Sequence, residues 1–134
     1  MNTINKETKQ NLKTKFHDFK QGNFSSEDTA TVLNNVDEIL MKSKSGPLRE
    51  FFDDIKTMCS MVKSWAKNEY KEIPIRTIGM VILTLGYVFF PIDLIPDTIP
   101  ILGLMDDAML VNWCLAAIRS DIHEYRLWAQ GNGK

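Results

Sequence analysis

The feature that most constrains this sequence is an uncharged, largely apolar run over residues 77–92. In a helix its 16 positions would reach roughly 24 Å, at about 1.5 Å per residue. A bilayer core needs about 30 Å, and the run is bounded by Pro74, Arg76, Pro91 and Asp93. It therefore predicts a central helix buried among other helices. A helix that is embedded in a membrane or dips into it is the alternative.

The segment after this run cannot be one regular helix. Pro91, Pro96 and Pro100 each lack a backbone N–H and push the preceding residue toward extended geometry. The side chains between them are mostly apolar, whereas loops normally expose polar side chains. We therefore expect an apolar loop that packs back over the helices. Asp93 and Asp97 would accept hydrogen bonds from the backbone N–H groups of its turns.

Four aspartates lie within a span of 15 residues: Asp93, Asp97, Asp106 and Asp107. The last two are expected in the first turn of a helix, where negative charge meets the positive end of the dipole. With Arg119 as an ion-pair partner, the four form a candidate polar site that holds the loop rather than performing catalysis. The alternative is convergence of the carboxylates on Mg2+ or Ca2+, as in a divalent-metal-dependent enzyme. No other cofactor is predicted, because the sequence has no glycine-rich phosphate loop. It also has too few histidines to propose a Ser-His-Asp catalytic arrangement.

An ordered set of Tyr, Pro, Asp and Gly positions runs through this stretch: Tyr87, Pro91-Ile92-Asp93-Leu94-Ile95-Pro96-Asp97, Ile99-Pro100, Leu102-Gly103 and Asp106-Asp107. It closely resembles the signature of the YkvA-like proteins, a bacterial family of small helical domains of unknown function. Asn68-Glu69-Tyr70, Arg119 and Trp128 also look like that family, so the resemblance covers residues 61–128. It implies a helical fold and no established activity. Members of the family are suspected of membrane association because of the same apolar run.

The organisation predicted for residues 1–134 is a single all-α domain of about five helices. The uncharged run and a last helix, about Leu104 to Ala129, form a central apolar hairpin joined by the Pro-rich loop. The last helix is apolar on almost every side from Ala108 to Ile118, which predicts that it is buried. Amphipathic helices wrap the hairpin. Those within residues 1–45 include one that starts at Ser25-Ser26-Glu27-Asp28 and stops near Lys44, and another runs from Pro47 to Ala66.

A basic amphipathic helix is predicted over residues 4–21, with Phe16 and Phe19 on its apolar face. Its lysines lie largely off that apolar face: Lys6, Lys9, Lys13 and Lys20. The apolar face would either dock on the domain or lie on an anionic membrane surface. These lysines and phenylalanines are therefore the candidate residues for contact with a membrane surface.

Composition limits the compartment and the class of partner. The net charge of -1 argues against a nucleic-acid binder, and the polar N-terminus lacks the apolar core of a secretory signal. Cys59 and Cys114 lie in apolar helical patterns and are expected to be buried and reduced. The predicted location is the cytoplasm. Association with the inner face of the membrane is the further expectation.

The function predicted from these observations is that of a non-enzymatic helical module that associates with a membrane surface or a protein partner. Two alternatives stay open, namely a divalent-metal-dependent enzyme that uses the aspartates and a soluble regulatory or protective binding protein. The sequence predicts neither an identified ligand nor an oligomeric state.

Overall fold

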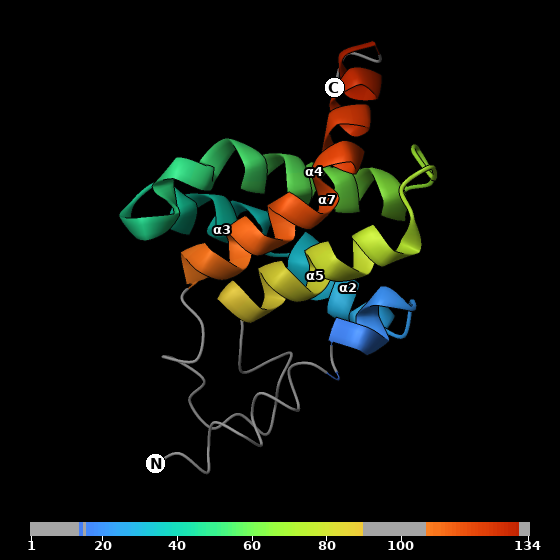
Figure 1. Cartoon of the computed structure of the whole chain (residues 1–134), viewed down its shortest axis with the longest axis horizontal. Helices are drawn as coiled ribbons and strands as arrows, with labels where there is room; N and C mark the ends of the chain where they lie inside the picture. The colour runs from blue at the N-terminus through green and yellow to red at the C-terminus, as the bar shows by residue number, and fades with distance from the viewer. Residues whose placement is uncertain (1–13, 15, 90–106, 132–134) are drawn as a thin grey trace.

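The computed structural model describes residues 14, 16–89 and 107–131, and these residues form an all-helical fold (Figure 1). After a short helical segment at residues 16–20 come α2 (Ser26–Leu33), α3 (Val36–Ser43), the 3-10 helix η1 (Gly46–Phe51), α4 (Phe52–Ala66), α5 (Ile75–Phe89) and α7 (Asp107–Gly131). The all-α prediction is confirmed. The expected number of about five helices is close to the six labelled elements of the described residues.

Helix α5 is the centre of the fold. Every residue from Thr77 to Tyr87 is buried, and α2, α4 and α7 all contact the helix. Its last described residue is Phe89, two positions before Pro91, where the sequence predicts the helix to end. Within the described ranges, no helix is both long enough and apolar enough to cross a membrane.

The segment at residues 16–20 lies directly against α5 at Gly79. A Cβ atom placed on Gly79 would be 1.9 Å from the backbone carbonyl oxygen of Phe19, so the two backbones meet where no side chain intervenes. Phe16 and Phe19 are 9% and 2% exposed and belong to the hydrophobic core. The structure thus places both phenylalanines in the domain interior, which matches the docking alternative for this helix.

A side-chain cap defines the start of α2, and backbone hydrogen bonds at a residue with positive φ define the end of α4. At the start of α2, the Ser25 hydroxyl accepts a hydrogen bond from the Asp28 N–H at 3.1 Å, and the Asp28 carboxylate accepts one from the Ser25 N–H at 3.0 Å. At the end of α4, Asn68 adopts φ 63°, and the N–H groups of Asn68 and Glu69 bond back to the carbonyls of Trp65 and Ser64. The first of these ends is the helix start expected from the sequence.

Two predicted helices are divided differently in the structure. The helix expected from Ser25 to about Lys44 is interrupted at Asn34 and Asn35, because asparagine side chains compete for backbone hydrogen bonds. The Asn35 amide donates to the Thr31 carbonyl at 2.8 Å instead of continuing one regular helix. The helix expected from Pro47 begins as η1, and the α-helical geometry starts at Phe52.

The prediction that the last helix is buried on almost every side is wrong for one face of α7. Met109 is 61% exposed and Trp113 is 45% exposed, although the Trp113 ring packs edge-on against Phe16 at 5.2 Å. The opposite face packs on α5, α4 and η1. A kink at Ile118, with φ -113° and ψ 15°, divides the helix and changes the direction of its second half.

Two buried threonines on α5 provide a matched test of this core. The Thr77 hydroxyl donates to the Asp121 carboxylate at 2.5 Å, whereas the Thr84 hydroxyl makes no hydrogen bond of ordinary geometry within the described residues and has only the Cys114 thiol as a weak neighbouring partner. The Cys114 thiol beside Thr84 donates instead to the Met80 carbonyl, over 3.9 Å.

We expect Thr77→Val to lower the free energy of unfolding by about 1.5–3 kcal/mol, because it removes a hydrogen bond to a charged group. Thr84→Val should raise it by about 1 kcal/mol, because valine has the same shape and leaves no unsatisfied buried hydroxyl. Urea unfolding of the two variants and the wild type measures both changes. Shifts of the same sign would contradict this assignment of partners.

Candidate functional site

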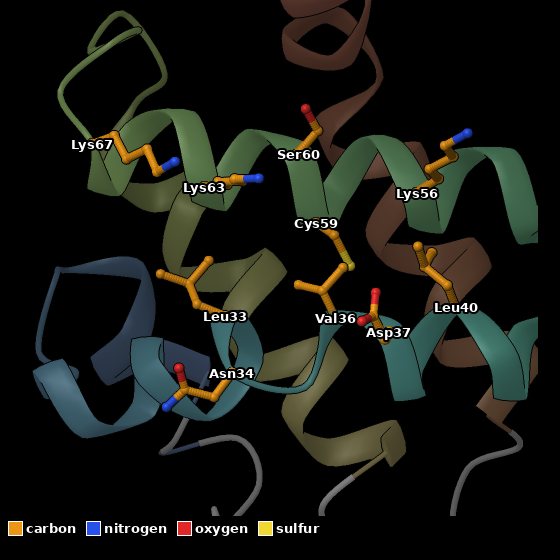
Figure 2. Close-up of a pocket in the computed structure, with 10 residues that line it drawn as sticks. All are labelled: Leu33, Asn34, Val36, Asp37, Leu40, Lys56, Cys59, Ser60, Lys63 and Lys67. Carbon is orange, nitrogen blue, oxygen red and sulfur yellow. The ribbon is translucent and has the colours of Figure 1, made fainter.

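A groove of about 540 Å³ lies between α4 and the α2–α3 pair (Figure 2). We call it the lysine groove. Its lining comes from all three helices and the turn between α2 and α3: Leu33, Asn34, Val36, Asp37, Leu40, Lys56, Cys59, Ser60, Lys63 and Lys67. The interruption at Asn34 and Asn35 turns α3 away from the line of α2, so that both helices lie along the same side of α4.

One wall of the lysine groove is a row of cations. Lys56 and Lys63 stand on α4, and Lys67 is the C-cap residue directly after it. All three are exposed, and their spacings of seven and four residues keep them on one side of the helix (Figure 2). Over eleven residues this row extends roughly 16 Å, at about 1.5 Å per residue. Asp37 on α3 is the acidic residue of the lining, so the formal charges of the groove sum to +2.

The floor of the lysine groove is apolar. It is formed by Leu33, Val36 and Leu40 from one side and by Cys59 from α4, whose side chain points toward Val36 in Figure 2. Burial raises the pKa of the Cys59 thiol to about 12, so the thiol stays protonated at neutral pH. Because the thiolate is the nucleophile and the metal ligand, Cys59 acts here as a small apolar side chain.

A second hollow of about 480 Å³ continues from the same helices and shares Leu33 with the lysine groove. We call it the Trp65 hollow. Phe24 packs on Trp65, with ring centroids 6.2 Å apart, and Ile75 at the start of α5 is 43% exposed. The Lys71 ammonium group lies 4.4 Å from the centre of the Trp65 ring, within range of a cation–π interaction. The two hollows together place exposed cations beside apolar and aromatic side chains.

The polar site predicted from the sequence falls mostly outside the described residues. This applies to Asp93, Asp97 and Asp106; Asp107 is the first residue of α7, and its side chain is not described. Arg119 is exposed on α7 and has no ion-pair partner among the described residues. Its pairing with the aspartates, and their alternative role as ligands of Mg2+ or Ca2+, therefore stay predictions. No cluster of three metal-ligating side chains occurs within residues 16–89 and 107–131.

The lysines of the helix predicted over residues 4–21 have a similar status. Lys6, Lys9 and Lys13 lie outside the described residues, while Lys20 is partly exposed. The lysine groove itself is not predicted from the sequence, where Lys56, Lys63 and Lys67 count only as part of a solvated helix face. In the sequence, the spacing of these three lysines indicates that they share one helix face. The apolar wall opposite them cannot be predicted in the same way, because it depends on how α2 and α3 pack.

Comparisons with known proteins agree with the motif of the central stretch. A family described as "Protein of unknown function (DUF1232)" matches residues 77–113. The "Uncharacterized membrane protein YkvA" of Bacillus subtilis (strain 168) is 28% identical over 74 residues, which cover 55% of this chain and 70% of that protein. No solved structure matches the chain. The two matches support the family resemblance predicted from the sequence.

Proposed function

We propose that this YkvA-like protein is a non-enzymatic helical module that binds an anionic membrane surface through the lysine groove and the Trp65 hollow. The observation that carries the proposal is the row of exposed cations on α4 beside an apolar groove. A basic side chain near an anionic lipid surface contributes about 1 kcal/mol of attraction. Lys56, Lys63 and Lys67 together would therefore contribute about 3 kcal/mol at low salt.

The apolar part of the same face would provide a second contribution. Tryptophan sits favourably at the boundary between lipid and water, because its ring is apolar and its N–H stays hydrated. Trp65 lies between the lysine row and the exposed Ile75, where lysine ammonium groups could reach headgroups while their stems cover apolar surface. This arrangement suits binding at the surface of a bilayer. The α5 side chains from Thr77 to Tyr87, by contrast, are already buried in the protein core.

The name of the Bacillus subtilis relative, an uncharacterised membrane protein, is consistent with this proposal. We assign the module to the inner face of the membrane, where anionic lipids give the surface its negative potential. A protein partner with an acidic surface is the alternative occupant, since it would meet the same lysines. Binding to pure lipid vesicles distinguishes the membrane surface from the protein partner, because such vesicles contain no protein.

The test is co-flotation of the purified protein with vesicles of phosphatidylcholine alone or mixed with phosphatidylglycerol. We expect binding to the mixed vesicles at about 0.05 M salt and its loss at about 0.5 M, because screening shortens the reach of surface charges. Trp65 fluorescence should shift to shorter wavelengths on binding, and replacing Trp65 with phenylalanine should remove that shift. Failure to bind the mixed vesicles at low salt would rule out a lipid surface and favour an acidic protein partner.

A further inference from the structure

A separate hollow lies between α7 and α4, on the side of α4 that carries Asp54. We call it the arginine hollow. It has a volume of about 200 Å³ and six lining residues, none of which lines the lysine groove: Asp54, Leu115, Arg119, Ile122, His123 and Arg126. A water molecule occupies about 30 Å³ of liquid, so the hollow has room for several waters or for one tetrahedral oxyanion.

The basic side chains of the arginine hollow stand on one face of α7. Arg119, His123 and Arg126 follow one another at intervals of four and three residues, the spacing that places helix residues side by side. All three lie after the kink at Ile118, on the second half of the helix. Leu115 and Ile122 are buried beneath them, so the basic side chains border an apolar floor.

Arg126 is fixed by contacts with α4. Its Nη2 atom donates to the Asp54 carboxylate at 2.8 Å and to the Thr57 hydroxyl at 3.0 Å, and its Nε atom donates to the same hydroxyl at 3.2 Å. These bonds hold the guanidinium in one orientation and neutralise Asp54, the one carboxylate that lines the hollow. Its Nη1 atom donates to no group in the described part of the chain.

Arg119 and His123 are not held by contacts of this kind. Within residues 16–89 and 107–131, neither Arg119 nor His123 has a hydrogen-bond or ion-pair partner, and both are exposed. With Asp54 paired to Arg126, the charge left in the hollow is that of Arg119. The hollow therefore combines unpaired N–H donors, a positive charge and a fixed neighbouring guanidinium.

We infer that the arginine hollow binds a phosphate monoester or inorganic phosphate. A guanidinium matches two phosphate oxygens with two parallel N–H donors, which suits Arg119, while His123 and the Nη1 of Arg126 would meet the remaining oxygens. The ligand would be either a free phosphate compound or the terminal phosphate of a lipid headgroup such as that of phosphatidic acid. This binding does not depend on the lysine groove.

The first experiment compares thermal unfolding in inorganic phosphate and in chloride at equal ionic strength, which cancels general screening. We expect phosphate to raise the melting temperature of the wild type, since a ligand that binds only the folded state stabilises it. Arg119→Gln should weaken phosphate binding tenfold or more, measured by titration calorimetry, because it removes charge-assisted hydrogen bonds. Arg49→Gln, which removes the same charge from an exposed site on η1, is the control and should bind phosphate like the wild type.

Equal melting temperatures in phosphate and chloride would overturn the inference, as would an Arg119→Gln protein that binds phosphate as tightly as the wild type. Because Arg119 is exposed and unpaired among the described residues, its substitution should leave the fold intact. Circular dichroism checks this directly. His123→Gln provides a second exposed variant, for which we expect weaker phosphate binding with unchanged helix content.

The second experiment identifies the source of the phosphate. Vesicles with phosphatidic acid or with phosphatidylglycerol, matched in surface potential, are compared for binding of the wild type and Arg119→Gln. A preference for phosphatidic acid that disappears in the variant assigns the hollow to a lipid headgroup. Phosphate binding in solution without that preference assigns it to a free phosphate compound. A variant of Lys56, Lys63 and Lys67 should keep the phosphate response, so that failure of the lysine groove and failure of this hollow are distinguishable.

Discussion

Replacing Gly79 with alanine is expected to lower the free energy of unfolding by about 3 kcal/mol or more. The new Cβ would lie 1.9 Å from the Phe19 carbonyl oxygen and 2.5 Å from the Phe19 carbonyl carbon, and neither backbone atom can move without shifting the whole segment. If residues 16–20 lift off α5 to make room, Phe16 and Phe19 lose their burial, which costs about 1.5–3 kcal/mol for each fully exposed side chain. Chemical denaturation of the variant and the wild type measures the loss.

Gly131→Ala is the matched control for this substitution. Gly131 lies in the last turn of α7, and a Cβ placed on it meets no atom within 4 Å. Alanine there should be neutral or stabilising by up to about 1 kcal/mol, since it restricts the unfolded chain and favours the helix. Equal stability of the Gly79→Ala and Gly131→Ala proteins would mean that the close contact between Phe19 and α5 is not present in solution.

Neutralising the lysine row is expected to reduce affinity for anionic vesicles by about a hundredfold at low salt. Replacing Lys56, Lys63 and Lys67 with glutamine removes about 1 kcal/mol of attraction for each residue, and each 1.4 kcal/mol corresponds to a factor of ten. Because all three side chains are exposed, the substitutions should leave the melting temperature nearly unchanged. Vesicle titration followed by Trp65 fluorescence provides the affinities.

A control variant with the same change in net charge separates the lysine row from general electrostatics. Substitution of Lys42, Lys44 and Arg49 by glutamine also removes three positive charges, from exposed positions that do not line the lysine groove. This variant should retain most of the affinity. If it loses as much affinity as the variant of the row, attraction depends on net charge and not on the groove.

A third variant, at Lys6, Lys9, Lys13 and Lys20, tests the basic residues proposed from the sequence. A large loss in that protein, with none in the variant of Lys56, Lys63 and Lys67, would assign the membrane contact to the N-terminal lysines instead.

The sequence was sufficient to predict the elements that depend on local chemistry or on one long apolar pattern. The buried course of α5 follows from the uncharged run that begins at Thr77, and the start of α2 follows from the capping chemistry of Ser25. The break at Asn34 and Asn35 was harder to predict, because Val32, Val36 and Ile39 continue the helical spacing across it. The Asn35 amide competes for the Thr31 carbonyl at the break, and the packing of α2 on α4 and α5 and of α3 on α4 then fixes the direction of each helix.

The candidate sites were less predictable for a related reason. Lys56, Lys63 and Lys67 look like an ordinary solvated face until α3 is placed beside α4, and Arg126 gains its role only through Asp54 and Thr57, more than sixty residues earlier in the chain. Contacts over such distances have no local signature. The aspartates of the family motif have a clear signature, but its physical meaning awaits the thermal melts with and without divalent ions that would distinguish a structural from a metal-binding role.

The burial of α5 from Thr77 to Tyr87 also has a consequence for how the chain is made. Synthesis proceeds from the N-terminus, so residues 16–20, α2 and α4, which cover α5, are already available when this apolar helix leaves the ribosome. Helix α7, which also packs on α5, is synthesised later. Until then the side of α5 that contacts α7 is uncovered by that helix. A chain that stops before α7 would therefore present a long apolar surface to its neighbours, and it should aggregate or be captured by chaperones rather than accumulate as a smaller folded domain.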